Sequence, residues 1–175
     1  MTQSRQKNSS AGGGCTKRMP ARFVRGDLFS YPGLQGLAHG CNCAGAMGKG
    51  IAVEFRSRFP RMYSEYKQRC ADGRFNLGDV FRWVEDGITI FNLGTQRTWR
   101  TKADLNALET AMSEMVRLAE QDGISKVGLP RIGSGLGGLP WEEVRACLDR
   151  IGKETGVELV VFEEYEPATH QNRSR

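Results

Sequence analysis

The sequence predicts an α/β fold with a largely parallel, buried sheet. Short apolar segments alternate along the chain with amphipathic segments of helical period, which is the pattern of a parallel sheet covered by helices. The two clearest helical segments span about residues 103–121 and 141–154. The chain has 175 residues, of which 39% are hydrophobic and 26% charged, so it suits one compact domain and leaves little room for two.

The two ends of the chain differ in composition from its middle. Residues 1–20 are rich in Ser, Gly and Lys and contain almost no large apolar residue, and residues 167–175 are similar. We therefore expect a disordered basic N-terminal arm over residues 1–20, a folded domain over residues 21–166 and a flexible C-terminal tail over residues 167–175.

The first part of the domain is predicted to contain two strands and an interrupted helix. The strands lie at about residues 22–25 and 37–41. The helix begins at about Gly50 and is interrupted at Pro60, because proline disfavours the interior of a helix. Apolar residues recur at helical spacing before and after the proline: Ile51, Phe55 and Phe59, then Met62, Tyr66 and Cys70.

A β-hairpin is predicted next, because the apolar runs at residues 80–84 and 88–93 flank the turn signal Asp86-Gly87. The helix over residues 103–121 follows and ends at Gly123. Its apolar stripe consists of Leu105, Leu108, Met112, Met115 and Leu118. A strand at residues 126–130, a helix at 141–154 and a last strand at 157–164 complete the domain.

The net charge of +5 is unevenly distributed along the chain. Residues 1–25 contain six basic residues and no acidic one, and the tail after Glu166 adds two more. The segment from Asp27 to Glu166 then holds 17 basic residues against all 20 acidic ones, a net charge of −3. A mildly acidic body lacks the basic stripe of a protein that reads duplex nucleic acid, so nucleic acid is a disfavoured partner.

Composition also excludes several classes of protein. No apolar run approaches the roughly 18 to 20 residues of a membrane-spanning helix, and the first fifteen residues lack the apolar stretch of a secretory signal. The five cysteines form no CxxC pair, so we expect reduced thiols and no zinc site. We expect a cytoplasmic monomer without a metal, a cofactor or membrane association.

Two glycine-rich segments each follow a predicted strand and precede a predicted helix. The first spans residues 41–51 and the second spans residues 130–141, with four glycines between Gly133 and Gly138. Glycine lets the backbone approach a ligand closely, and the amides at a helix start stabilise negative charge. Two such loops at the ends of strands in one sheet are suited to hold a diphosphate from both sides. Neither loop has the spacing of a Walker-type or dinucleotide fingerprint.

Several motifs, in order along the chain, together resemble the macrodomain, an ADP-ribose-binding module. They are Gly26-Asp27-Leu28-Phe29, the strand ending Leu37-Ala38-His39 with Asn42, the segment from Met47 to Ala52, and the segment from Leu129 to Leu139. The resemblance covers about residues 22–163. It is strongest to the branch that holds the terminal ADP-ribose protein glycohydrolase and the DarG antitoxin macrodomain. It implies a three-layer α/β/α sandwich with a mixed, largely parallel central sheet and ADP-ribose in a cleft at the strand ends.

The resemblance also implies which residues contact ADP-ribose. Asp27 would accept a hydrogen bond from the adenine amine, Asn42 would position the distal ribose, and Lys49 would lie near the pyrophosphate or the distal ribose. The full set of implied ligand-binding positions is Asp27, Leu28, Asn42, Met47, Gly48, Lys49, Gly50, Ile51, Thr95, Arg131, Ile132, Gly133, Ser134, Gly135, Leu136 and Gly137.

The sequence departs from the family at two positions that bear on catalysis. In both relatives a lysine follows a strand-ending threonine and is implicated in the chemistry, whereas Gln96 stands there in this chain. A glutamine amide cannot act as an amine nucleophile. The glycohydrolase also uses an aspartate in its second loop, at the position of Gly137. A mechanism through a lysine adduct is therefore not expected.

We predict a mono-ADP-ribosyl hydrolase that cleaves ester-linked ADP-ribose from Glu or Asp side chains, with mono-ADP-ribosylated proteins as partners. The candidate catalytic residues are Asn42, Gln96 and Lys49. Asn42 and the two loops would hold the distal ribose, the substrate's diphosphate would orient a water, and Gln96 or Lys49 would support the leaving carboxylate. Three alternatives stay open: a non-catalytic ADP-ribose reader, a hydrolase of ADP-ribosylated DNA, and a hydrolase of O-acetyl-ADP-ribose.

Other conspicuous residues have structural interpretations beside functional ones. Trp99 and Arg100 either cover the ligand or touch the modified protein, or Trp99 is a packing residue. His39 lies within an apolar strand and is expected in the core. Cys41 and Cys43 flank Asn42 and are expected to be small buried residues rather than reactive thiols.

Overall fold

The structure, a computed structural model, describes residues 18–165. The expected N-terminal arm up to residue 17 and the expected tail over residues 167–175 lie outside the described residues. In chain order the elements are β1 (Arg22–Gly26), β2 (Gly36–Asn42), α1 (Ile51–Arg58), α2 (Pro60–Ala71), β3 (Val80–Glu85), β4 (Ile88–Gln96), α3 (Leu105–Gln121), β5 (Lys126–Pro130), α4 (Trp141–Glu154) and β6 (Glu158–Tyr165).

The six strands form one mixed sheet in the order β1-β6-β5-β2-β4-β3. All neighbouring strands are parallel except β3 and β4, which form the predicted antiparallel hairpin. This arrangement confirms the predicted α/β fold with a largely parallel sheet. Because the strands before both glycine-rich segments, β2 and β5, are neighbours in the sheet, the two loops that follow them begin side by side.

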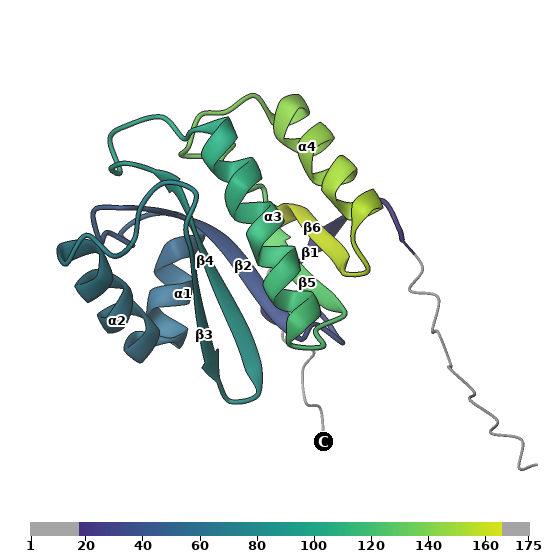
Figure 1. The fold of residues 1–175 in the computed structure, drawn as a ribbon, viewed down its shortest axis with the longest axis horizontal. Helices are drawn as coiled ribbons and strands as arrows, with labels where there is room; N and C mark the ends of the chain where they lie inside the picture. Colours follow the sequence, from purple (N-terminus) through teal and green to yellow (C-terminus); the bar gives the residue numbers. More distant parts are fainter. Residues whose placement is uncertain (1–17, 166–175) are drawn as a thin grey trace, which may run out of the picture.

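Helices cover both faces of the sheet and create two separate hydrophobic cores (Figure 1). Consecutive residues of a strand point to opposite faces, so Phe91 of β4 packs in the core under α3 and α4, whereas Ile90 packs in the core under α1 and α2. Val161 and Val160 of β6 divide in the same way. The predicted three-layer α/β/α sandwich is therefore correct.

The helix boundaries follow from local chemistry. Pro60 is the first residue of α2, and the Phe59 N–H donates to the Phe55 carbonyl where α1 ends, so the predicted interruption is confirmed. The long helix begins at Leu105 rather than at residue 103, because the Asp104 carboxylate caps it by accepting a hydrogen bond from the Ala107 N–H at 2.9 Å. Of the expected apolar face of α1, Phe55 is fully buried, whereas the flanking Ile51 and Phe59 are half-buried.

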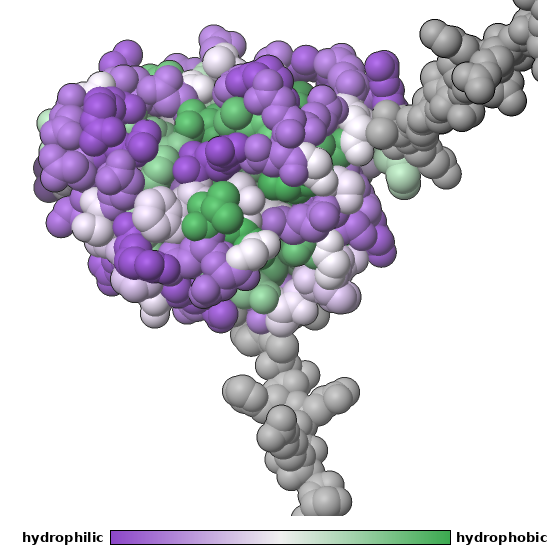
Figure 2. Space-filling model, turned by 60° about the horizontal axis from the view of Figure 1, so that its bottom comes forward, coloured by the Kyte–Doolittle hydropathy of each residue, from purple (hydrophilic) through white to green (hydrophobic). Residues whose placement is uncertain are grey.

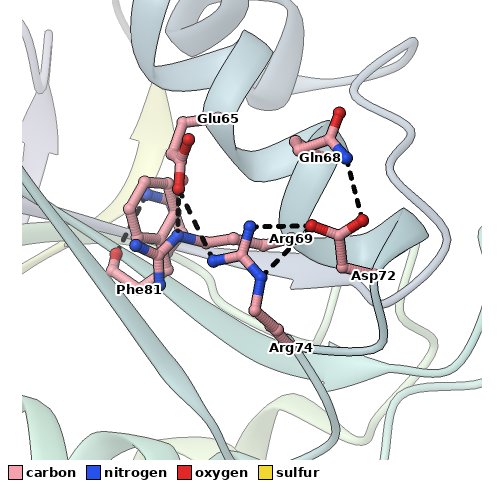
Figure 3. Close-up of polar contacts among 7 residues, drawn as sticks. Glu65, Gln68, Arg69, Asp72, Arg74 and Phe81 are labelled. Atoms are coloured by element: carbon pink, nitrogen blue, oxygen red, sulfur yellow. Dashed lines mark hydrogen bonds and ion pairs between the residues drawn. The ribbon is translucent and has the colours of Figure 1, made fainter.

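A network of charged side chains holds the C-terminal end of α2 against β3 (Figure 3). The Arg69 guanidinium lies 4.3 Å from the centre of the Phe81 ring, and its Nε donates to Glu65 at 2.8 Å. Arg74 binds Asp72 at 2.9 Å, and Asp72 also accepts from Gln68 at 2.8 Å. These pairs are partly exposed, so each contributes little by itself, and the Arg69 guanidinium covers the apolar ring of Phe81.

The β3–β4 hairpin lies at the bottom of Figure 1, and Figure 2, which brings the bottom forward, shows apolar side chains in the middle of that face surrounded by hydrophilic ones. Two surface hollows, of about 630 and 420 Å³, lie on the outward face of α3 and between the hairpin and the turn after α3. Neither is lined by a residue of the glycine-rich loops.

Within residues 18–165, no helix has the length and apolar character to cross a bilayer.

Candidate functional site

The candidate site lies between the carboxyl ends of β2 and β5, where the two strands separate. Their ladder pairs Gly36 with Val127 and Leu37 with Gly128, and it ends there, although β2 continues to Asn42 and β5 to Pro130. Neighbouring strands that stop pairing before their ends leave room for a ligand between the loops that follow them. The two strands therefore stop pairing before the two glycine-rich loops begin, and we call the region between these loops the candidate cleft.

The first glycine loop, residues 43–50, and the second, residues 131–140, face each other across this cleft. A Cβ atom placed on Gly50 would lie 3.3 Å from the Leu136 Cδ1 atom. Gly50 has a φ of 59° and directly precedes α1, and no side chain within residues 18–165 caps the N-terminus of α1. The second loop likewise leads into α4 without a side-chain cap. Both loops thus bring uncapped helix amides to the same region, which favours an anionic ligand.

Two glycines in these loops have no structural reason to be glycine. Gly48 and Gly135 do not adopt a positive φ, and among the described residues no atom lies within 4 Å of a Cβ added at either position. The other explanation for glycine is the close approach of a ligand to the backbone. Gly48 and Gly135 are thus the two positions in the loops where a ligand is the best explanation of the residue type.

Gly137 is different, because its own loop excludes a side chain there. A Cβ on Gly137 would lie 2.4 Å from the Gly133 carbonyl oxygen, and the Gly137 carbonyl accepts a hydrogen bond from the Ala103 N–H at 2.8 Å. The Ser134 hydroxyl and the Leu139 N–H make further bonds within the loop. In this conformation no aspartate fits at position 137, so the departure from the family's pattern is built into the loop.

Asn42 organises the first glycine loop. Its Oδ1 atom accepts from the backbone N–H groups of Ala44 at 3.0 Å and Ala46 at 3.2 Å, and its Nδ2 donates to the Ala46 carbonyl at 2.7 Å. The Tyr66 hydroxyl donates to the Asn42 carbonyl at 2.6 Å. Asn42 is 6% exposed, so its amide is enclosed by the loop that it shapes. The contact of Asn42 with a ribose stays a prediction, and the structure adds a role in setting the loop.

Tyr66 belongs to this site, although the sequence indicates it only as one of the apolar residues at helical spacing after Pro60. It is fully buried, and burial raises the pKa of its hydroxyl, which keeps it a neutral donor to Asn42. Tyr66 lies on α2, 24 residues from Asn42. No local pattern reports a contact over that separation, so the helical spacing of the apolar residues was the only signal.

Gln96 lies next to Asn42 on the neighbouring strand. The two residues are partners across the β2–β4 ladder, and the Cys43 N–H donates to the Gln96 carbonyl at 2.8 Å. The Gln96 side chain is half-buried, and its Nε2 donates to the Thr101 carbonyl at 2.7 Å. One amide hydrogen of Gln96 is thus used to close the loop after β4, and the second is available for another acceptor.

Lys49 and Asp27 are the charged residues of the predicted site. Lys49 is exposed at the end of the first glycine loop and makes no ion pair within residues 18–165. Asp27 is half-buried directly after β1, and its Oδ1 accepts from the Phe29 N–H at 2.9 Å. The structure gives no further bond to the carboxylate of Asp27 within the described chain, so the other oxygen can accept from an amine.

Several predicted ligand-binding residues are buried and could contact a ligand only through their backbone. Their side chains are at most 2% exposed or, for Gly137, consist of hydrogen alone: Leu28, Met47, Thr95, Ile132 and Gly137. Arg131, Gly135 and Leu136 are exposed on the second loop, and Leu136 is 70% exposed. The predicted residues thus lie at one end of the sheet. Some of them could contact a ligand through their side chains, and the others only through their backbone.

His39 and Cys41 are buried, as predicted, whereas Cys43 is half-buried and packs against the edge of the core under α1 and α2. His39 is fully buried and stacks on Phe55 with ring centres 3.8 Å apart, and burial lowers its pKa to about 4. Burial raises the pKa of Cys43 to about 11, and burial also raises the pKa of Cys41 well above its usual value. Neither thiol is activated as a nucleophile. Among the described residues, no group of three or more His, Cys, Asp or Glu side chains could hold a metal ion.

Comparison with known proteins gives matches over most of the chain. The family model of the Macro domain matches residues 38–148. A DNA ADP-ribosyl glycohydrolase of Thermus aquaticus is 33% identical over 155 residues, which is 85% of this chain and 43% of that protein. The human ADP-ribose glycohydrolase OARD1 is 30% identical over 140 residues, 80% of this chain and 89% of that protein. This chain spans less than half the length of the DNA ADP-ribosyl glycohydrolases that it matches.

Solved structures agree with these matches. The macrodomain of Thermus aquaticus DarG superposes with a TM-score of 0.75 at 32% sequence identity, and the alignment covers 82% of this chain and 97% of that one. The macrodomain of Mycobacterium tuberculosis DarG gives a TM-score of 0.76 at 30% identity, with 86% and 99% covered.

Proposed function

Since the chain belongs to the macrodomain family, we propose that it binds ADP-ribose between its two glycine loops and hydrolyses the ester that joins ADP-ribose to a Glu or Asp side chain of a protein. The resemblance inferred from the motifs is confirmed at the level of the family. Relatives of this chain are named as ADP-ribose glycohydrolases, which supports a hydrolase.

One observation carries the proposal: the two loops face each other where β2 and β5 separate. Among the described residues neither helix N-terminus has a side-chain cap, and each loop contains a glycine, Gly48 or Gly135, whose added Cβ would meet no described atom within 4 Å. Backbone amides from two sides neutralise a diphosphate without a fixed cation. Asp27 directly follows β1, which β6 and β5 separate from β2 in the sheet. Within the described residues, one oxygen of its carboxylate has no partner and can accept a hydrogen bond from an adenine amine.

The proposed hydrolysis needs little acid catalysis, because a carboxylate is a good leaving group. Water adds to the anomeric carbon of the distal ribose, the bond from that carbon to the ester oxygen breaks, the carboxylate leaves with the electron pair, and the proton of the water passes to solvent. The protein's contribution is then the positioning of the ribose and the stabilisation of the negative charge on the departing carboxylate.

Lys49 fits the second of these roles best among the three candidates. It carries a positive charge, is exposed at the cleft end of the first loop and has no ion-pair partner within the described residues. Asn42 has its amide enclosed by the loop, which suits positioning, and Gln96 has one amide hydrogen left to donate. We therefore assign the charge-stabilising role to Lys49, the positioning role to Asn42 and a supporting hydrogen bond to Gln96.

A second candidate is hydrolysis of ADP-ribosylated DNA. It is favoured by the relatives that bear the name DNA ADP-ribosyl glycohydrolase and by the similarity to two DarG macrodomains. Those relatives are more than twice as long as the matched region, so they contain segments that have no counterpart in the match to this chain.

The test is the release of free ADP-ribose from a protein modified on glutamate, run beside a serine-linked sample and a single-stranded DNA modified on thymidine. Binding of free ADP-ribose is measured in parallel. We expect release from the glutamate sample and a strong loss of release in Lys49→Gln, with Lys153→Gln as the matched control, an exposed lysine on α4. Release from DNA alone would replace the first candidate by the second. Binding without any release would make the chain a reader and contradict both.

A further inference from the structure

We propose that residues 97–102, the loop between β4 and α3, form a docking surface for an acidic peptide segment. We call these residues the docking loop. The segment would be the part of the target protein next to its modified carboxylate. The inference deepens the proposed function and rests on it, because a docking surface beside the cleft matters only if the cleft receives ADP-ribose attached to a protein.

The docking loop lies at the rim of the candidate cleft. At its start, the Cys43 N–H of the first glycine loop donates to the carbonyls of Gln96 at 2.8 Å and Arg97 at 3.2 Å. At its end, the Ala103 N–H donates to the Gly137 carbonyl of the second glycine loop at 2.8 Å. The loop is therefore fixed to both walls of the cleft, and a chain bound on it would be adjacent to the bound ribose.

The docking loop is also preformed. The Thr98 N–H donates to the Thr101 hydroxyl at 3.0 Å, and that hydroxyl donates back to the Thr98 carbonyl at 3.0 Å. The Gln96 side chain fixes the Thr101 carbonyl from outside the loop. A surface that is already ordered loses little conformational entropy on binding. This gives Gln96 a positioning role through the loop, in addition to its place beside Asn42.

The charges of the docking loop are uncompensated. Arg97, Arg100 and Lys102 are exposed, no acidic residue lies among residues 97–102, and none of the three forms an ion pair within residues 18–165. Many exposed cations elsewhere are paired, such as Arg117 with Glu114 and Arg150 with Glu109, whereas Lys49, Arg56, Lys67 and Arg131 form no ion pair within the described residues. A carboxylate that reaches the docking loop can thus be bound without the loss of an existing ion pair, and arginine binds carboxylates in a two-point geometry.

Trp99 gives the docking loop an apolar anchor. Its side chain is 59% exposed, and the Arg100 guanidinium lies 5.7 Å from the ring centre. Large exposed hydrophobic side chains are few among the described residues, and Trp and Arg are residue types that often dominate the binding energy of protein interfaces. An exposed tryptophan between uncompensated arginines, fixed beside the cleft, is therefore the combination expected of a peptide-binding surface.

The extent of the surface favours a peptide over a nucleic acid strand. A protein that binds single strands combines stacking residues with a basic groove that follows the backbone over several nucleotides. Here three uncompensated cations and the tryptophan lie within six consecutive residues, Lys49 and Arg131 are the further unpaired cations of the glycine loops among the described residues, and the segment from Asp27 to Glu166 carries a net charge of −3. A short acidic peptide matches this extent.

The experiment is a fluorescence anisotropy titration of the full chain with a labelled peptide that alternates glutamate with apolar residues. We expect binding that weakens as salt is raised. We expect Trp99→Ala and Arg100→Gln each to weaken it by roughly fivefold to tenfold. Val84→Ala removes an apolar side chain of the same exposure, 60%, from β3, and Arg117→Gln removes an exposed cation from α3, so both should bind as the wild type does.

Three outcomes would overturn the docking surface. These are no binding of the acidic peptide, equal binding by Trp99→Ala and the wild type, and tighter binding of a short single-stranded oligonucleotide than of the peptide with the same sensitivity to Trp99→Ala. Calorimetry with free ADP-ribose separates the two proposals. If the wild type binds ADP-ribose but not the peptide, the docking surface fails and the proposed function stands, whereas no ADP-ribose binding refutes the function itself.

Discussion

Asn42 shows how one side chain can set the form of a ligand-binding loop. Its amide makes three hydrogen bonds to the backbone of Ala44 and Ala46, so the chain turns back on itself directly after β2. An amide is suited to this role because it offers both an acceptor and a donor to neighbouring peptide groups. The first glycine loop therefore depends on Asn42 before any ligand binds.

Replacement of Asn42 by alanine should lower both stability and affinity. The backbone groups of Ala44 and Ala46 lose their partners, so we expect a loss of about 1 to 3 kcal/mol in the free energy of unfolding. We also expect at least a roughly tenfold loss in ADP-ribose affinity, because a loosened loop must be ordered again on binding. Denaturant unfolding and calorimetry measure the two. Asn106→Ala, at an exposed position of α3, is the control, and equal effects of the two variants would contradict the role of Asn42.

Lys49 should affect turnover more than binding. Its charge is needed mainly when negative charge develops on the leaving carboxylate, and removal of one such group commonly costs about a hundredfold in rate. For Lys49→Gln we therefore expect a fall in kcat of about tenfold or more with a smaller change in KM. A rise in KM with kcat unchanged would show that Lys49 only binds the substrate.

In the second glycine loop, a side chain is excluded at one glycine but would fit at another. Gly137 packs against the Gly133 carbonyl, whereas Gly135 faces open space. We expect Gly137→Asp to destabilise the protein by about 1 to 3 kcal/mol, because the added side chain must displace backbone. Gly135→Ala should leave the midpoint of thermal unfolding nearly unchanged. If Gly137→Asp were as stable as the wild type, the loop would not have the packing described.

Regular elements were predictable from the sequence, whereas contacts between distant segments were not. The strand Lys126–Pro130 and the helix Trp141–Glu154 lie where the sequence predicts them, because their apolar patterns are uninterrupted. The start of α3 was misplaced by two residues because the capping role of Asp104 was overlooked. The bond between Tyr66 and Asn42, and the exclusion of a side chain at Gly137, depend on tertiary packing that no local pattern reports.

At the scale of the whole molecule, the sheet separates two hydrophobic cores. His39 is buried next to the core that lies under α1 and α2. It is 0% exposed, stacks on Phe55 and bonds Asn92 at 2.8 Å through Nε2. Burial lowers its pKa from 6.5 to about 4 despite the bond to Asn92. The folded state therefore holds His39 neutral at pH values where the unfolded chain would protonate it.

This burial predicts a loss of stability in mild acid. The contribution of His39 is fully present above pH 6.5 and is lost as the pH falls from 6.5 to about 4, because only the unfolded state takes up the proton in that window. The loss from this group amounts to roughly 3 kcal/mol. We expect the free energy of unfolding to fall more steeply over this range in the wild type than in His39→Gln. Parallel profiles for the two proteins would contradict a buried neutral His39.

The central claim is that ADP-ribose binds between the two glycine loops, and calorimetric titration of ADP-ribose into the wild type and Gly135→Val tests it most directly. No described atom lies within 4 Å of a Cβ at this position, so we expect the valine to leave thermal stability nearly unchanged while it fills the place of the ligand. We predict tight binding by the wild type and at least a roughly tenfold loss in the variant. Failure of the wild type to bind, or equal affinity in the two proteins, would contradict the claim.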